Sequence, residues 1–309
     1  MEHLEINEEI VRLAYQLILG REPESEAVVR SHLHLGTIAR LRQAMMNSQE
    51  FRSKMQQMQY SAGSKWVAVE VLDQFVLWID LHDLAVSQPC LQGNYEPSET
   101  AYFIAKLKEG DTVLDIGANI GWYTLVAAKH IRMQGHIHAF EPRPDTLRYL
   151  KRTIHDNRLQ DLVTVWPYAL SDKAGKLKLV WAKNTTNPGG SFMTSESISG
   201  HEAVEVEVAV LDELIPDIAP DVIKIDVEGA EPRVFRGAQK AIARKKPPIL
   251  SELHPKQLMR VSEVTPAQYI NQMADYGYQC WLLEEARPTR KLKDFPSDVH
   301  KDLISVVFE

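Results

Sequence analysis

Apolar side chains in the first part of the chain recur at intervals of three and four residues, the spacing of one buried helix face. This pattern starts at Glu8, and Gly36 followed by Thr37 is typical of a helix stop and the N-cap of the next helix. The periodicity is lost over residues 56–65, which include Ser-Ala-Gly-Ser and predict a linker. We therefore expect a small all-α domain over residues 1–60.

The pattern changes to the short apolar runs of β-strands from Trp66 onward. Residues 66–72 and 75–81 are rich in β-branched and aromatic side chains and predict an antiparallel hairpin. Five further apolar runs follow, most of them separated by helix-length segments, which predicts an α/β fold with a doubly wound, mostly parallel sheet. These five predicted strands cover residues 112–116, 136–140, 162–165, 222–225 and 248–253.

The interval between the third and the fourth of these strands is too long for a single helix. It contains two alternating stretches, residues 176–182 and 204–210, which predict a β-hairpin insertion. The polar loop between them, residues 184–200, is either a lid over a binding site or only an irregular turn. Apolar runs at residues 279–283 and 304–308 predict a closing antiparallel pair at the sheet edge.

Composition and charge argue against several classes of protein. The 309 residues are 44% hydrophobic and 25% charged, which is enough for a sizeable core. The net charge of −7 disfavours binding to bulk nucleic acid, because neutralising phosphates requires basic side chains. The two cysteines, Cys90 and Cys280, suit neither a disulfide framework nor a zinc site, so we expect a cytoplasmic location. The acidic N-terminus is unlike a signal peptide, and we expect no membrane span.

A glycine loop joins the first of the five predicted strands to the next helix. Gly117 and Gly121 stand where the backbone must turn sharply and let a ligand approach. Asn119 replaces the second glycine of a dinucleotide fingerprint, which disfavours a pyrophosphate ligand. Asp115 suits a cationic amine, and Glu141 stands where an acid accepts hydrogen bonds from a ribose. The loop therefore predicts S-adenosylmethionine, the alternative being a tight turn between two surface carboxylates.

Ionisable side chains follow the last two of these strands. Lys224, Asp226 and Glu228 alternate on one side, and Glu252 with His254 repeats this pattern on the next strand. Unpaired burial of such charges costs several kcal/mol, so they must pair, reach solvent or hold a ligand. With an ordinary pKa of about 6.5, His254 is suited to take the proton of a hydroxyl nucleophile, oriented by Asp226 or Glu228. The alternative is a structural pair between Lys224 and a carboxylate.

A divalent metal is a second possibility at the same strand ends. Asp226, Glu252 and His254 together offer the oxygen and nitrogen ligands that Mg²⁺, Mn²⁺ or Fe²⁺ prefers. We keep this metal set as an alternative to catalysis by a protein base alone.

Three motifs together resemble the FkbM-type S-adenosylmethionine-dependent methyltransferases. They are Val-Leu-Asp-Ile-Gly-Ala-Asn-Ile-Gly at 113–121, Phe-Glu-Pro at 140–142 and, most specific, Ile-Lys-Ile-Asp-Val-Glu-Gly-Ala-Glu at 223–231. The resemblance covers residues 96–255 and implies a seven-stranded Rossmann-like class I methyltransferase fold. It also implies O-methylation of a hydroxyl on a saccharide, glycan or natural-product intermediate. Methylation of an amide or amine nitrogen is the alternative, since such members are known.

The resemblance also implies roles for individual residues. The methyl group would be faced by the catalytic set Asp226, His254, Glu228, Lys224 and Glu252. The ribose would lie against Glu141, and the adenine edge against residues 169–172. The full cofactor-binding set is Asp115, Gly117, Ala118, Asn119, Gly121, Tyr123, Thr124, Glu141, Pro142, Ala169, Leu170 and Ser171.

The domain organisation adds one indication about the acceptor. The second domain is expected over residues 61–309, with the hairpin at 66–81 ahead of a catalytic core at 96–309. The stretches Ala-Tyr-Gln-Leu-Ile-Leu-Gly-Arg-Glu-Pro-Glu at 14–24 and Ser-Gln-Glu-Phe-Arg at 48–52 resemble a small helical domain of unassigned role that accompanies glycosyltransferases. This resemblance implies a glycan acceptor or association with glycan-assembly enzymes. Packing on the catalytic domain or a homodimer contact is the alternative. An NAD-type oxidoreductase, which Asn119 argues against, and an inactive methyltransferase-like scaffold are the competing functions.

Overall fold

The computed structural model describes residues 6–48, 50–51, 65–132, 135–182, 190–194 and 200–309. Contacts within the chain divide it into two compact units, residues 1–65 and 66–309, which are described separately. Among the described residues, no helix has both the length and the apolar character that crossing a bilayer requires.

The first unit is helical where the periodicity predicts it. Its helices begin at N-caps, and the side chains of Asn7, Ser25 and Thr37 each accept the backbone N–H three residues further on. Val11 and Leu41 are among the buried residues of its own small core. The elements are α1 (Glu8–Ala14), the π-helix η1 (Tyr15–Leu19), α2 (Glu26–Leu33) and α3 (Ile38–Met46).

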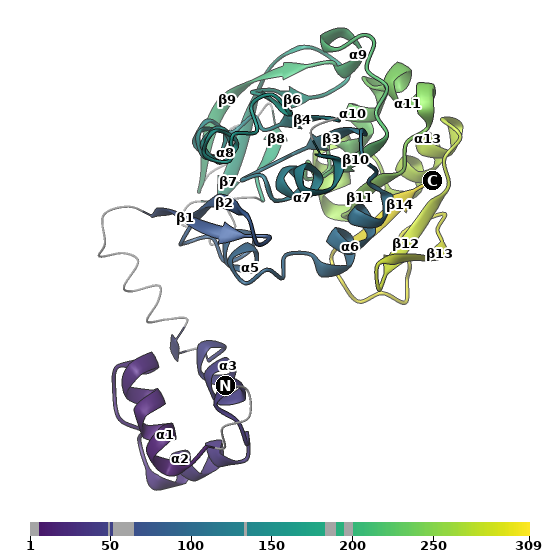
Figure 1. The fold of residues 1–309 in the computed structure, drawn as a ribbon. Helices are drawn as coiled ribbons and strands as arrows, with labels where there is room; N and C mark the ends of the chain where they lie inside the picture. Colours follow the sequence, from purple (N-terminus) through teal and green to yellow (C-terminus); the bar gives the residue numbers. More distant parts are fainter. Residues whose placement is uncertain (1–5, 49, 52–64, 133–134, 183–189, 195–199) are drawn as a thin grey trace. The chain divides into compact units, whose positions relative to one another are not determined.

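The second unit is built on an eight-stranded sheet with the order β13-β12-β14-β11-β10-β3-β4-β5 (Figure 1). The five strands from β11 to β5 are parallel, and β14 is antiparallel to both β11 and β12. This confirms the doubly wound sheet and the antiparallel pair of the tail. The strands are β3 (Thr112–Ile116), β4 (His136–Phe140), β5 (Val163–Trp166), β10 (Val222–Ile225), β11 (Ile249–Leu253), β12 (Cys280–Glu284), β13 (Arg287–Lys291) and β14 (Ile304–Phe308).

The expected number of seven strands was wrong by one. Glu285 and Ala286 both have a positive φ, and the tight turn they form folds the chain back to add β13 at the sheet edge. The strand itself, Arg-Pro-Thr-Arg-Lys, is almost entirely exposed. Because it has no apolar alternation, the hydrophobic pattern does not reveal it.

Helices cover both faces of this sheet. Val113 belongs to a core with residues of α6, α7 and α8, whereas its neighbour Leu114 packs in a second core with residues of α10, α11 and α13. The helices of this unit are α5 (Ser87–Leu91), α6 (Pro97–Lys106), α7 (Trp122–Ile131), α8 (Pro144–Asp156), α9 (Leu211–Leu214), α10 (Glu231–Arg236), α11 (Gln239–Lys245), α12 (Pro255–Gln257), the π-helix η3 (Leu258–Ser262) and α13 (Pro266–Asp275).

Two smaller sheets complete the unit. The predicted insertion forms a four-stranded sheet of order β6-β9-β7-β8, in which β7 and β9 are the expected antiparallel pair. Much of the loop predicted over 184–200 lies outside the described residues, so its role as a lid stays a prediction. The N-terminal hairpin is confirmed as β1 and β2. The strands are β1 (Trp66–Val71), β2 (Phe75–Asp80), β6 (Ala169–Leu170), β7 (Gly175–Ala182), β8 (Phe192–Thr194) and β9 (His201–Ala209).

Candidate active site

The carboxyl ends of four parallel strands place ionisable side chains at one edge of the central sheet. Asp115 lies near the end of β3, and Glu141 and Asp226 directly follow β4 and β10. Glu252 lies near the end of β11. Because β10, β3 and β11 are neighbours in the sheet, the loops after them meet.

The glycine loop after β3 turns as predicted, and the packing of the chain adds a further reason for its glycines. Gly117 has a φ of +85°, and a Cβ there would lie 1.9 Å from the backbone oxygen of Asp226. A Cβ on Gly121, with a φ of +101°, would lie 2.7 Å from Cδ1 of Leu150. The chain itself makes the close approaches at both positions. The fold itself therefore requires both glycines, and their role beside a ligand stays a prediction.

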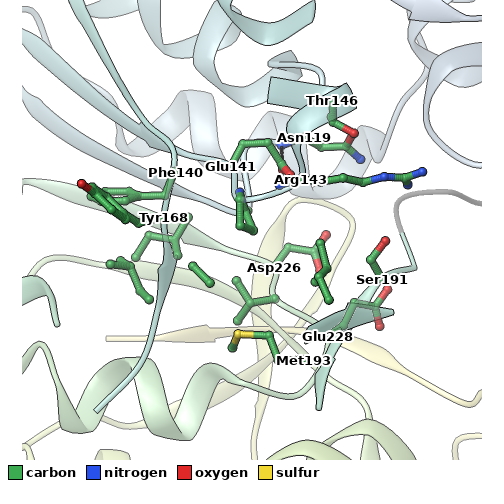
Figure 2. A pocket seen from close by; sticks show the side chains of 17 residues that line it. Asn119, Phe140, Glu141, Arg143, Thr146, Tyr168, Ser191, Met193, Asp226 and Glu228 are labelled. Carbon is green, nitrogen blue, oxygen red and sulfur yellow. Dashed lines mark hydrogen bonds between the residues drawn. The ribbon is translucent and has the colours of Figure 1, made fainter. Parts of the chain in front are cut away.

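A cavity with an empty volume of about 700 Å³, which includes space open to solvent, lies beside this loop. We call it the Glu141 cavity. Figure 2 shows Phe140 and Tyr168 at one side of it and Asp226 and Glu228 at the other. One side is therefore aromatic, while the side that faces β10 is acidic.

Glu141 is a buried polar group of this cavity, with only 7% of its surface exposed. The backbone N–H of Asn119 donates to its Oε2 at 3.0 Å, and that of Arg143 donates to its Oε1 at 2.8 Å. Burial raises the pKa of Glu141 to about 7, although both hydrogen bonds favour the ionised form. Each oxygen keeps a free lone pair, so the side chain can still accept hydrogen bonds from a ligand.

A second, smaller cavity lies on the other side of the loop and shares Gly117, Asn119 and Asp226 with the first. We call it the Asp115 cavity. The Thr124 hydroxyl donates to Asp115 at 2.5 Å, and burial raises the pKa of Asp115 to about 6. A carboxylate fixed in this way lines a space suited to a cationic group.

Most of the predicted cofactor-binding residues line one or both of these cavities. Gly121, Thr124 and Ser171 line neither cavity. Thr124 supports Asp115, and Asp172, beyond Ser171, forms an ion pair with Arg236. The Glu141 cavity is lined by Gly117, Asn119, Glu141, Pro142, Ala169 and Leu170, and the Asp115 cavity by Asp115, Gly117, Ala118, Asn119 and Tyr123.

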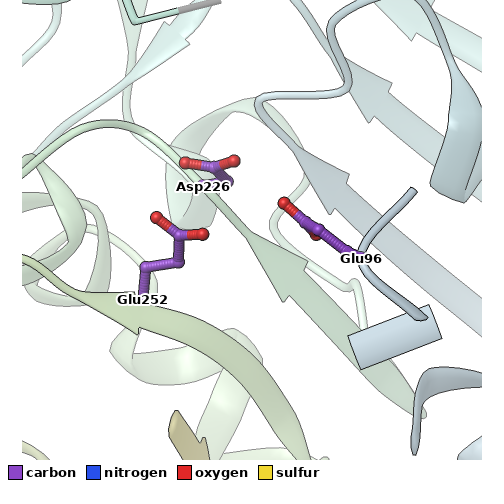
Figure 3. Close-up of side chains that lie close together, drawn as sticks. All are labelled: Glu96, Asp226 and Glu252. Atoms are coloured by element: carbon purple, nitrogen blue, oxygen red, sulfur yellow. The ribbon is translucent and has the colours of Figure 1, made fainter. Parts of the chain in front are cut away.

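Three carboxylates meet where β10 and β11 end, and we call them the carboxylate cluster. Oxygens of Glu96, Asp226 and Glu252 all lie within 4.8 Å of one another (Figure 3). Lys224, which is 3% exposed, places its Nζ 3.9 Å from Glu96 and 3.8 Å from Asp226. One buried ammonium therefore faces three carboxyl groups, which is more than it can neutralise if all of them are ionised.

The cluster strongly perturbs the ionisation of its members. Burial, reinforced by the neighbouring carboxylates, raises the pKa of Asp226 and holds that of Glu252 well above its ordinary value. Burial lowers the pKa of Lys224, but Glu96 and Asp226 outweigh it and raise that pKa overall. The lysine therefore stays charged while the carboxylates compete for protons, and such groups are suited to proton transfer.

Glu96 is the member of the cluster that the sequence did not reveal. Its backbone is left-handed, with φ 43° and ψ 62°, directly before Pro97 at the start of α6. Its Oε2 accepts a 2.6 Å hydrogen bond from the Tyr123 hydroxyl. The only local signal is an acid before a helix-initiating proline, and no motif links it to Asp226.

His254 does not lie where the alternation predicts. The strand β11 ends at Leu253, and His254 is the N-cap of α12. Burial lowers the pKa of its ring, and the charges acting on it are Asp302 and Lys256 rather than the cluster. Within the described residues His254 belongs to no group suited to a metal ion. The set of Asp226, Glu252 and His254 is therefore corrected to one in which Glu96 replaces the histidine.

Glu228 also departs from the predicted alternation. The strand β10 ends at Ile225, and Glu228 has a φ of +52° ahead of Gly229 at +95°. It lines the Glu141 cavity, whereas Lys224 lines the Asp115 cavity. Burial, followed by the charge of Asp226, raises the pKa of Glu228 to about 8.

Comparison with known proteins identifies the family of this unit. The family model described as the methyltransferase FkbM domain matches residues 115–280, and the chain belongs to this family. This confirms the resemblance predicted from the motifs of the second domain.

Individual relatives match over shorter lengths. The hexuronic acid methyltransferase AglP of Haloferax volcanii is 32% identical over 145 residues, which cover 45% of this chain and 54% of the relative. Methyltransferase sdnD of Sordaria araneosa is 32% identical over 171 residues, with 45% and 65% covered. The chain thus spans about half to two thirds of these relatives. The solved structure of methyltransferase FkbM from Methylobacillus flagellatus KT is 16% identical with a TM-score of 0.43, covering 96% of this chain and 58% of that one.

Proposed function

We propose that the chain is an S-adenosylmethionine-dependent methyltransferase that methylates a hydroxyl of a saccharide or natural-product intermediate. The observation that carries the proposal is the position of Asp226. It lines both the Glu141 and the Asp115 cavity, and its carboxylate belongs to the cluster that Glu252 and Glu96 complete. Family membership and the name of the Haloferax relative, which acts on a hexuronic acid, support a methyltransferase with a saccharide acceptor.

The residues present fit S-adenosylmethionine. The Glu141 carboxylate has free lone pairs for ribose hydroxyls, and Phe140, Tyr168 and Leu170 offer apolar surface for a purine. Asp115 and Asp226 supply negative charge for the cationic end of the molecule. When bound, S-adenosylmethionine supplies an electrophilic methyl group on a positively charged sulfur.

In the transfer, the acceptor oxygen would bond to the methyl carbon as the bond from that carbon to sulfur breaks, the sulfur keeping the electron pair and leaving as S-adenosylhomocysteine. The carboxylate cluster would receive the proton that the acceptor hydroxyl loses. Asp226 is the proposed base, because it alone of the cluster also lines the two cavities beside the glycine loop. The ammonium of Lys224, 3.8 Å away, favours its ionised form. Glu252 and Glu228, whose pKa values are also raised, are proposed to take the proton onward.

The first experiment is a calorimetric titration with S-adenosylhomocysteine, with NAD as the control ligand. We expect micromolar binding of the former only. Because Glu141 has a pKa of about 7, it is largely neutral at pH 6 and ionised at pH 8, where it is the stronger hydrogen-bond acceptor. Affinity should therefore rise from pH 6 to pH 8 in the wild type, whereas Glu141→Gln should bind roughly tenfold more weakly with little pH dependence.

Two variants complete this test. Glu213→Gln, which removes an exposed carboxylate that lines neither cavity, should bind like the wild type. Asp226→Asn should lose about 10²- to 10⁴-fold in turnover, measured at saturating S-adenosylmethionine because the loss of charge also weakens binding of the cationic end of the cofactor. Failure of the wild type to bind S-adenosylhomocysteine would remove the proposal, and full turnover by Asp226→Asn would remove the assigned base.

A further inference from the structure

We propose that a third cavity receives the methyl acceptor and selects acceptors that carry a protonated amine, such as amino sugars, over acceptors that carry a carboxylate or phosphate. This inference rests on the proposed function. The cavity has an empty volume of about 1420 Å³, including space open to solvent, and is lined by the start of α6, the end of β11 and the segments around β12 and β14. We call it the Glu99 cavity.

The position of this cavity suits an acceptor. Glu96 and Glu252 line it, and both belong to the carboxylate cluster with Asp226. Asp226 in turn lines the Glu141 and Asp115 cavities. The cluster therefore stands between the space proposed for S-adenosylmethionine and the Glu99 cavity. An acceptor in the Glu99 cavity would present its hydroxyl to the proposed base.

The lining of the cavity is strongly acidic. Its only basic side chain among the described residues is Lys301. Two of its acids are already neutralised, since Asp302 pairs with Lys256 at 2.6 Å and Glu285 with Arg287 at 3.0 Å. The acidic side chains of the lining are Glu96, Glu99, Glu252, Glu284, Glu285 and Asp302.

Two of the remaining acids, Glu99 and Glu284, have hydrogen-bond partners that do not cancel their charge. Glu99 accepts a hydrogen bond from the Ser305 hydroxyl, and Glu284 accepts one from Thr289 at 2.7 Å. Neither has a basic side chain within ion-pair distance in the described part of the chain. A hydroxyl donor orders a carboxylate and leaves its negative charge in place. Glu99 and Glu284 are therefore fixed anions that face the cavity.

This arrangement discriminates by repulsion as well as by attraction. A uronate or phosphate in the cavity would meet the two anions Glu99 and Glu284, with Lys301 as the single basic side chain of the described lining, while a protonated amine would form charge-assisted hydrogen bonds with both acids. The amine would be bound by the carboxylates of Glu99 and Glu284, while a neighbouring hydroxyl of the acceptor reaches Asp226. Glu99 and Glu284 are thus specificity-determining residues.

The test uses three methyl hexosides that differ in one substituent: methyl glucosaminide, methyl glucoside and methyl glucuronide. Ligand-observed NMR would measure their binding to the full chain saturated with S-adenosylhomocysteine, at pH 6.5 and low salt, where the amine is protonated. We expect the glucosaminide to bind at least about tenfold more tightly than the glucuronide, with a preference that falls as salt is added. The combined variant Glu99→Gln/Glu284→Gln should lose most of this preference.

Glu205→Gln is the matched control, because Glu205 pairs with Lys176 on the insertion sheet away from this cavity and should leave the preference intact. Equal or tighter binding of the glucuronide, no binding of any hexoside, or an unchanged preference in the double variant would overturn the inference. S-adenosylhomocysteine binding in the same samples separates the two proposals. If it is present, only the acceptor inference has failed, and if it is absent, the proposed function has failed.

Discussion

At the scale of single residues, Glu96 shows how contacts distant in sequence fix a site. A left-handed backbone costs a residue with a Cβ about 1–2 kcal/mol, and a following proline restricts it further. The conformation of Glu96 is held by the Tyr123 hydroxyl at 2.6 Å and by the charge of Lys224 at 3.9 Å. These partners come from α7 and β10. A sequence pattern reports local periodicity, and it therefore cannot pair Glu96 with them.

We predict that Glu96→Gln moves the acid limb of the pH–rate profile to lower pH. The glutamine can still accept the Tyr123 hydrogen bond, so the backbone should hold. Burial is the largest cause of the raised pKa of Asp226 and Glu252, and the charge of Glu96 adds to it. Without that charge both pKa values fall, and the base stays ionised in more acidic solution. The measurement is kcat/KM for methyl transfer between pH 5 and 9.

Glu213→Gln is the comparison for this profile, since Glu213 is an exposed carboxylate that lines none of the three cavities. Its acid limb should stay in place. An acid limb that is unmoved or shifted to higher pH in Glu96→Gln would contradict the electrostatic coupling inferred for the cluster.

At the scale of elements, the sequence predicted the buried strands, but it missed an exposed strand and misplaced a side chain that follows a strand. The five parallel strands were predicted to within about one residue at each end because each is a buried apolar run. β13 is exposed along most of its length, and its sequence carries no such signal. The error at His254 came from extending the alternation of β11 past its end at Leu253. The direction in which a side chain points after the end of a strand depends on the conformation of the following turn, and hydrophobic periodicity does not specify that conformation.

The glycine loop gives a test at this scale. Gly117 and Gly110 have nearly equal φ values, +85° and +88°, but a Cβ on Gly110 meets nothing within 4 Å. Gly110→Ala should therefore cost only the left-handed strain, about 1–2 kcal/mol. Gly117→Ala adds a clash with the backbone of Asp226 and should cost more than about 3 kcal/mol, because β3 and β10 would have to separate.

Urea unfolding of both variants, with the yield of folded protein recorded, would measure this difference. Equal free energies of unfolding for Gly110→Ala and Gly117→Ala would show that the loop relaxes around the added methyl group. In that case, Asp226 would not be fixed by its contact with Gly117.

At the scale of the whole molecule, the site concentrates acids that the fold buries. The family match lies within residues 66–309. Burial raises the pKa of Asp115 to about 6, of Glu141 and Glu231 to about 7 and of Glu228 to about 8. The folded chain therefore binds more protons than the unfolded chain above pH 6.5. Stability favours the protonated form of these carboxyl groups, whereas the proposed ligand favours the ionised form of Glu141.

We predict that the chain becomes less stable between pH 6.5 and pH 8.5. A carboxyl with a raised pKa contributes stability that is full below its ordinary pKa and is lost as pH rises through its folded value. Burial lowers the pKa of His136 and His138, which acts in the opposite direction, but only below about pH 6.5. The carboxyl groups therefore determine how stability changes between pH 6.5 and pH 8.5. Since each kcal/mol of lost stability lowers the Tm of a unit of this size by roughly 2–4 °C, we expect the Tm to fall by about 5 °C.

Differential scanning calorimetry at constant ionic strength would measure this shift. Glu141→Gln should show a smaller fall, because the amide removes one of the titrating groups, whereas Glu213→Gln should follow the wild type. S-adenosylhomocysteine, which we expect to bind better to ionised Glu141, should raise Tm more at pH 8.5 than at pH 6.5. A Tm that rises with pH without ligand would contradict the raised pKa values of these carboxyl groups and show that the fold holds them ionised at little cost.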